Sequence, residues 1–114
     1  MSTVSSKLQN ALKDIAPIRA GTYIPDDNET EVYIVTNYFS RPIEHMDDEP
    51  VFEEYSVQVH LFCPSGMNSI TMRKRIKKKL YQAGFTWPTS QDASDADGQH
   101  IVFECMIDGN VGEE

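Results

Sequence analysis

The chain has 114 residues, of which 39% are hydrophobic and 25% are charged, and its formal net charge is −8. This length favours a single domain over residues 1–114, and the composition excludes a largely disordered chain. An acidic chain lacks the broad basic surface of most nucleic-acid-binding proteins. The first ten residues lack the basic start and apolar run of a signal peptide, and no apolar stretch approaches the roughly 20 residues of a transmembrane helix. We therefore expect a protein that is made in the cytoplasm and has no membrane partner.

The N-terminal region predicts an amphipathic helix over residues 3–15, followed by a loop. Ser2 or Thr3 can cap the start of the helix, and Pro17 prevents its continuation. The segment 21–31 contains a glycine, a proline and a cluster of acids, which predicts turn and loop. One helical face carries the apolar residues Val4, Leu8, Ala11, Leu12 and Ile15.

Two strands separated by a polar segment are predicted next. Residues 32–39 are β-branched and aromatic, whereas residues 40–50 contain two prolines and predict a mobile loop. Residues 53–63 alternate strictly between two faces, as in a strand of an antiparallel sheet with one buried side. The buried side is expected to hold Tyr55, Val57, Val59, Leu61 and Cys63, and the wetter side Glu54, Ser56, Gln58 and His60.

A second helix and two further strands complete the predicted domain. The helix covers residues 69–83, with Gly84 suited to its C-cap, and its core-facing stripe is Ser69, Met72, Ile76, Leu80 and Ala83. Residues 85–87 can open a short strand, residues 100–107 alternate as a last strand, and residues 109–114 form a flexible tail. The order helix, strand, strand, helix, strand, strand predicts an α+β fold. We expect a mostly antiparallel four-stranded sheet with two helices packed on one face.

The sequence contains no pattern for catalysis, a metal or another cofactor. The string over 93–104 resembles a calcium loop, but Ala93 stands at its first ligand position, and an acidic turn between strands explains it better. The three histidines show no metal-ligand spacing, and no nucleophile motif is present. Cys63 and Cys105 are expected to be free buried thiols, unless neighbouring strands bring them close enough for a disulfide.

The most unusual feature is a basic run on the second predicted helix. It holds six of the ten basic residues of the chain: Arg73, Lys74, Arg75, Lys77, Lys78 and Lys79. Like charges one turn apart destabilise a helix by about 0.2–0.5 kcal/mol per pair, which suggests a counter-charge nearby. Three explanations stay open: a solvated face neutralised by the chain's own acidic loops, a contact with an acidic patch of a neighbouring subunit, and a direct phosphate contact. The candidate acidic partners are Asp26, Asp27, Glu29, Asp47, Asp48 and Glu49.

Several stretches together resemble a known protein family. They are "EVYIVTNYF", the acidic "DDEP", "EEYSVQVHLFCPSG", a helix ending "LYQAGF" and a strand "HIVFECMI". In this order, over roughly residues 4–108, they are similar to the small tail completion or tail terminator proteins of long-tailed phages and prophages. Further matches to the family pattern are Pro17, Gly21 and Tyr23, and Leu80, Ala83, Gly84 and Phe85, whereas the heavily basic helix departs from it.

The resemblance implies a structural virion protein without enzyme activity. Such proteins form a homo-oligomeric ring, commonly a hexamer, that caps the tail tube and joins it to the head. The implied partners are the tail tube protein and head–tail connector proteins, with DNA passing through unbound and assembly in the host cytoplasm. An alternative from another class is a small nucleic-acid-binding module that uses the basic helix over residues 73–79.

Overall fold

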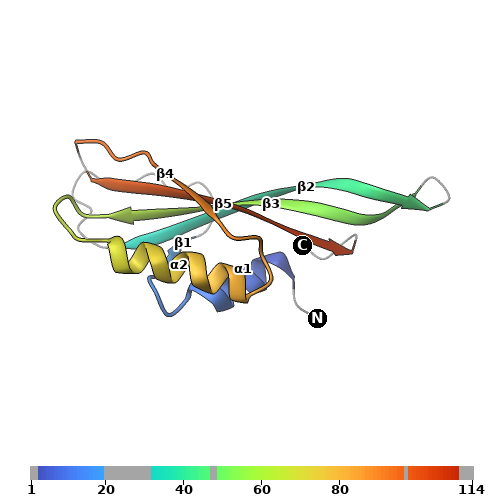
Figure 1. Cartoon of the computed structure of the whole chain (residues 1–114), viewed down its shortest axis with the longest axis horizontal. Coiled ribbons are helices and arrows are strands. Elements are labelled where there is room, and N and C mark those ends of the chain that lie inside the picture. The colour runs from blue at the N-terminus through green and yellow to red at the C-terminus, as the bar shows by residue number, and fades with distance from the viewer. Residues whose placement is uncertain (1–2, 20–31, 47–48, 97, 111–114) are drawn as a thin grey trace.

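A computed structural model shows two helices and five strands in the described residues, which are 3–19, 32–46, 49–96 and 98–110 (Figure 1). In chain order the elements are α1 (Val4–Leu12), β1 (Ile18–Arg19), β2 (Tyr33–Met46), β3 (Glu49–Cys63), α2 (Ile70–Gln82), β4 (Thr89–Asp92) and β5 (Gln99–Asn110). No helix in these ranges is long and apolar enough to cross a membrane.

The strands form one sheet in the order β1-β2-β3-β5-β4. All neighbouring pairs are antiparallel except β1, which runs parallel to β2 through Ile18 and Arg19. The predicted α+β class, with a mostly antiparallel sheet, is confirmed. The two-residue β1 is an addition that the sequence did not predict, and it begins beside Pro17, whose carbonyl accepts the Ile34 N–H at 2.8 Å.

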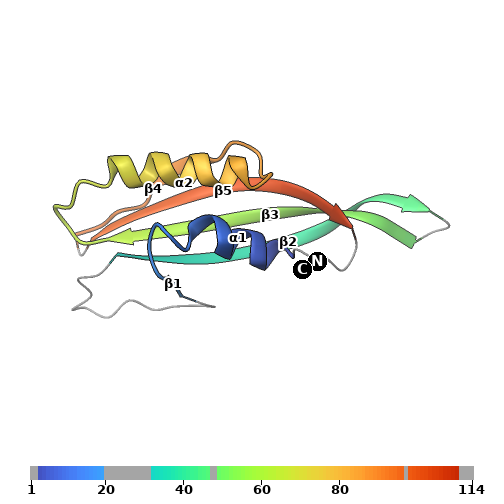
Figure 2. The ribbon, with the colours of Figure 1, turned by 90° about the horizontal axis from the view of Figure 1, so that it is seen from below.

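Both helices lie on the same face of the sheet, which leaves the other face without a helical layer (Figure 2). The strand register explains which residues they cover. Val59 of β3 stands beside Thr36 of β2 and Phe103 of β5, and the alternation predicted for residues 53–63 places its five apolar residues in the core. Facing them from α2 are the fully buried Ile76 and Leu80, as predicted from the helical stripe.

The helix ends follow the predicted local chemistry with small shifts. The Thr3 hydroxyl accepts the N–H of Ser6 at 3.1 Å and caps α1, which ends at Leu12 because the chain turns ahead of Pro17. After α2, Gly84 adopts φ 105°, a left-handed conformation that few other residues take without strain.

The predicted loop over 40–50 is wrong for most of its length, because β2 continues to Met46 and β3 begins at Glu49. The Ile34 N–H points away from β3 to the carbonyl of Pro17, so every second residue up to Pro42 presents its nitrogen to this outer edge. Pro42 therefore costs no hydrogen bond between β2 and β3, and bulges after it absorb the remaining irregularity.

Two smaller predictions near the C-terminus also need correction. Residues 85–87 form no strand, although Thr86 contacts β5: its N–H donates to the Met106 carbonyl and its hydroxyl accepts the Met106 N–H, both at 2.9 Å. The edge strand begins two residues later at Thr89. Residues 109–110 belong to β5 rather than to a tail, and residues 111–114 lie outside the described residues.

Candidate interaction site

Arg73 differs from the other residues of the basic run because its side chain is directed toward the sheet. Its guanidinium faces β5, and Nη2 donates to Gln99 Oε1 on that strand at 3.2 Å. Its Nε donates at 2.9 Å to the Oγ of Ser69, the N-cap residue of α2. The Ser69 hydroxyl also donates to Gln99 Oε1, and the Gln99 amide donates to the carbonyls of Pro64 and Met67. Arg73 therefore ties the start of α2 to the sheet and is not part of an outward basic surface.

The other five cations of the run form the surface that we call the basic face: Lys74, Arg75, Lys77, Lys78 and Lys79. Lys77 is half-buried, and the other four are exposed. Within the described part of the chain, none of the five makes an ion pair. The structure thus presents a cationic helix that forms no ion pair with any described residue of the same chain.

The proposed acidic partners cannot be placed beside this face. Asp26, Asp27, Glu29, Asp47 and Asp48 lie outside the described residues, and Glu49 is described only as the first residue of β3. Neutralisation by the chain's own loops therefore stays a prediction.

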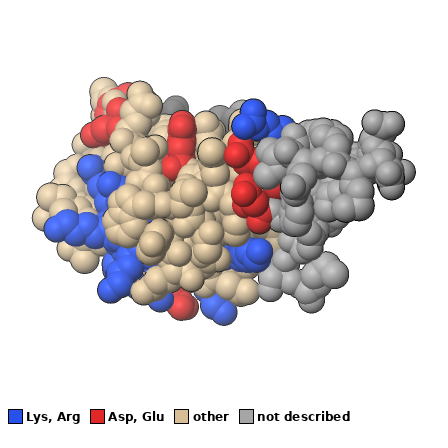
Figure 3. All heavy atoms as spheres, turned by 45° about the vertical axis from the view of Figure 1, so that its right-hand side comes forward, with Lys and Arg blue, Asp and Glu red and all other residues tan. Residues whose placement is uncertain are grey.

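Charge is strongly segregated between the helices and the rest of the chain. The helical segments 4–15 and 69–83 contain eight of the ten basic residues and one of the 18 acidic residues, so they carry +7 and the remainder −15. Figure 3 shows many of the Lys and Arg side chains at the left and lower left of the described surface, with Asp and Glu mainly along its upper and central parts. The helical segments are therefore cationic, whereas the five strands, with two basic and seven acidic residues, carry −5.

An exposed aromatic pair adjoins the basic face. Tyr81 on α2 and Trp87 on the segment before β4 are 58% and 56% exposed, and their rings meet edge to face with centroids 5.6 Å apart. This pair was not predicted from sequence, because a turn through Gly84 separates the two residues.

The helix-free side of the sheet, which we call the open face, carries acidic and apolar residues. On β5 it presents Glu104, Met106 and Asp108, all exposed, and the strand register places Met106 beside Ser56 and Ser56 beside Phe39. Among its described side chains, Arg41 supplies the positive charge, and Arg41 Nε already donates to Glu54 Oε1 at 3.0 Å.

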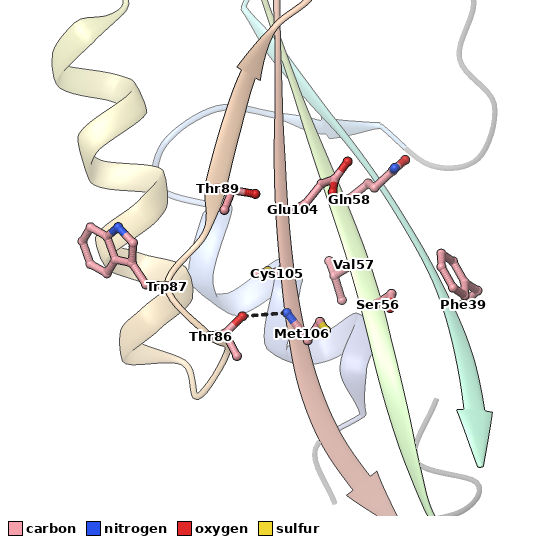
Figure 4. Close-up of a pocket in the computed structure, with 10 residues that line it drawn as sticks. All are labelled: Phe39, Ser56, Val57, Gln58, Thr86, Trp87, Thr89, Glu104, Cys105 and Met106. Carbon is pink, nitrogen blue, oxygen red and sulfur yellow. Dashed lines mark hydrogen bonds between the residues drawn. The ribbon is translucent and has the colours of Figure 1, made fainter. Parts of the chain in front are cut away.

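A shallow groove of about 380 Å³ crosses the open face (Figure 4). Phe39 and Trp87 stand at its opposite ends and Met106 lies between them, with Gln58, Thr89 and Glu104 on its polar side. Phe39 is 63% exposed and Met106 is 37% exposed, so two large apolar side chains meet solvent on a bare sheet. Apolar exposure bordered by carboxylates is typical of a surface that another molecule covers.

Two histidines pair at the other end of the open face. His60 Nδ1 and His100 Nε2 are 2.8 Å apart, so one of these nitrogens donates and the other accepts. Phe62 stacks on His100 with centroids 4.3 Å apart. Burial lowers the pKa of both histidines, and the neighbouring His100 further lowers that of His60. No cluster of three or more metal-binding side chains occurs in the described ranges.

The calcium-like string forms the turn between β4 and β5, as the sequence analysis favoured. Asp92 accepts the N–H of Ser94 at 2.9 Å, which is the main reason that its pKa is lowered. The Ala93 N–H donates to the His100 carbonyl at 2.7 Å, and Asp95 bridges to Gly98. These contacts close a hairpin, and Asp97 lies outside the described residues.

Cys63 and Cys105 are free and buried, as expected. Their strands are neighbours, but Cys63 stands opposite Gln99, six positions from Cys105 along β5. That offset corresponds to about 20 Å along the strand, which excludes a disulfide between them. Burial raises the pKa of both thiols, that of Cys105 to about 12, and Arg73 partly opposes the effect at Cys63. Both cysteines are therefore unreactive at neutral pH.

Comparison with known proteins adds no relative to this picture. No family model matches the chain, and no curated protein is significantly similar to it.

Proposed function

We propose that this chain is a structural virion protein, a tail completion or terminator protein of a long-tailed phage or prophage. It acts as a subunit of a homo-oligomeric ring, which we expect to be a hexamer, that caps the tail tube and joins it to the head. The sequence resemblance suggests this assembly. The observation that carries the proposal is the segregation of charge, +7 on the helical segments and −15 on the remainder.

Charge segregation favours head-to-tail association. A two-fold contact between helical layers would set +7 against +7, whereas a contact between the helical layer of one copy and the open face of the next, which presents Glu104 and Asp108, is attractive. Contacts that join two different surfaces repeat from copy to copy, and they close into a ring when the rotation per copy permits.

The long β2–β3 hairpin supports the same conclusion. The pairing of β3 with β5 ends at Phe52 and Asn110, so the distal part of the hairpin is two-stranded and extends beyond the helices (Figure 1). A two-stranded hairpin is marginally stable by itself in water, so this arm gains stability by packing on a neighbour. Its residues 41–54 include six acidic side chains and one basic side chain.

The proposed environment follows from the same charges. An acidic ring does not grip DNA that must pass through it, because the negative surface repels phosphates. The protein would reside in the virion tail after assembly in the host cytoplasm, with the tail tube protein and head–tail connector proteins as partners. We propose no catalytic activity, because the sequence resemblance implies a structural protein.

The decisive experiment is electron microscopy of tails produced without this gene. Loss of a terminator leaves tubes of uncontrolled length, and restoring the gene restores a uniform length. Tails of normal length that fail only at a later step would contradict the terminator assignment.

A biochemical experiment tests the association itself. Light scattering of the purified chain should show association that weakens as salt screens the charges. The double variant Lys74→Glu/Lys78→Glu should weaken it further, because both residues belong to the basic face. The matched control Lys7→Glu/Lys13→Glu makes the same charge change on α1. Equal effects of the two variants would show that net charge matters and that the basic face does not.

The aromatic pair favours one alternative, a small nucleic-acid-binding module. Tyr81 and Trp87 beside the basic face offer rings for base stacking, and Trp87 is the single tryptophan of the chain. Its fluorescence therefore reports directly on this surface. Quenching by single-stranded DNA that is lost in Lys74→Glu/Lys78→Glu would establish this alternative, and unchanged fluorescence would exclude it.

A further inference from the structure

We infer that the groove on the open face receives the outward side of α2 from a second copy of the chain. This inference rests on the proposed head-to-tail assembly and names the two surfaces that meet in it.

The receiving surface has an apolar centre. Phe39, Ser56 and Met106 stand side by side on β2, β3 and β5, so the row spans about 10 Å between its outer strands. Ser56 is the small residue in the middle, with larger side chains on both sides. The row lies in the groove, which crosses the strands between Phe39 and Trp87 (Figure 4).

Carboxylates flank the apolar centre along the strand direction. Glu104 and Asp108 precede and follow Met106 by two residues on the same face of β5, and both are exposed. Glu54 lies beside Asp108 on β3 but is already paired with Arg41. Glu104 and Asp108 form no ion pair with a described residue, so this surface selects a partner that presents both apolar and basic groups.

The outward side of α2 presents both apolar and basic groups. Ile70, Lys74, Lys77 and Tyr81 recur at i, i+4, i+7 and i+11 and so share one stripe, about 16 Å long, on the helix surface. Ile70 and Tyr81 are 56% and 58% exposed, and the lysines lie between them. A helix laid across the strands can set the two apolar ends of this stripe toward the two ends of the groove, at Phe39 and Trp87, while its lysines reach the carboxylates on either side of Met106.

The helix that fills the groove must belong to another chain. The chain's own α2 packs on the opposite side of the sheet, with Ile76 and Leu80 in the core (Figure 2). Seating a second copy's α2 on the open face gives the sheet a helical layer on both sides, an arrangement common among layered folds. Each copy then offers one helix and one groove, which is the requirement for a head-to-tail chain of subunits.

Intermolecular paramagnetic relaxation tests this contact directly. A spin label is attached at Gln82→Cys, an exposed position on α2, and this chain is mixed with isotope-labelled native protein. The native cysteines are buried and do not compete for the label. We expect line broadening at the amides of Ser56 and of residues 104–108 in the isotope-labelled native chain, which carries no spin label. The matched control Gln9→Cys, exposed on α1, should leave those amides sharp.

Two surface substitutions provide an independent test. Phe39→Ser in the groove and Ile70→Ser on α2 should each weaken association by about tenfold without changing the thermal midpoint, because both side chains are mostly exposed in the monomer. Gln91→Ser, on the same sheet face but on β4, serves as the control.

The outcomes separate the inference from the proposed function. Association that persists with no broadening in the groove overturns the inference and leaves the ring proposal standing. If the chain remains monomeric even at high concentration, the inference is overturned as well. In that case only the electron microscopy of tail length tests the ring proposal.

Discussion

Arg73 should stabilise the fold, whereas its neighbour Lys74 should not. Arg73→Ala removes two hydrogen bonds from a charged donor, one to Ser69 and one to Gln99. Such bonds contribute about 1.5–3 kcal/mol each when buried. The guanidinium is only half-buried, so we expect a loss of about 2 kcal/mol in total. For a domain of this size that loss lowers the melting temperature by about 8 °C.

Lys74→Ala is the matched control for this experiment. It removes the same charge one residue along α2, at an exposed position without an ion pair to any described residue. Each change also relieves one like-charge pair in the helix, so that contribution cancels in the comparison. We expect Lys74→Ala to alter the unfolding free energy by less than about 0.5 kcal/mol, measured by urea denaturation. Equal stability of the two variants would refute the structural role of Arg73 and return it to the basic face.

Further predictions concern stability. Leu80→Ala should reduce the unfolding free energy by about 2–5 kcal/mol in urea denaturation, because the fully buried side chain leaves a cavity. Gly84→Ala should cost about 1–2 kcal/mol in the same assay, since its φ of 105° disfavours a side chain although space is available beside Ile107. Thr3→Ala should cost about 1 kcal/mol through loss of the α1 cap, and Thr3→Ser should retain most of it. Because the folded pKa values of His60 and His100 are lowered, the unfolded chain binds more protons below about pH 6.5. The free energy of unfolding should therefore fall as the pH drops from about 6.5 through the folded pKa values. If the dependence of this free energy on pH is unchanged in His100→Gln, the histidine pair is not its origin.

The parts of the fold that depend on local periodicity could be predicted from sequence. The alternation over 53–63 and the stripe of α2 place Val57, Leu61, Ile76 and Leu80 in the core, because burial of one face dictates both patterns. The left-handed Gly84 was also predictable, because a glycine directly after a helix commonly forms its C-cap with a positive φ.

Features that depend on partners distant in sequence could not be predicted. The polar hairpin beyond Ser40 resembles a loop in sequence, because its strands are held by cross-strand pairing. Its proline does not interrupt that pairing, since the proline nitrogen faces the outer edge. A helical wheel cannot show that Arg73 meets Gln99, 26 residues away. The groove likewise depends on register, which brings Phe39 into line with Met106 only once three strands are paired.

Head-to-tail association predicts that a chain with both surfaces reversed assembles with itself and rejects the native chain. The reversed chain carries Lys74→Glu and Lys77→Glu on α2, and Glu104→Lys and Asp108→Lys on the open face. In a mixture, every contact between reversed and native chains sets like charges together, so we expect mixed contacts to be disfavoured about thirtyfold. A two-fold contact between helices predicts the opposite, because a native and a reversed helix attract. Sedimentation of the mixture with one chain fluorescently labelled distinguishes the two, and preferential co-assembly would overturn the head-to-tail arrangement.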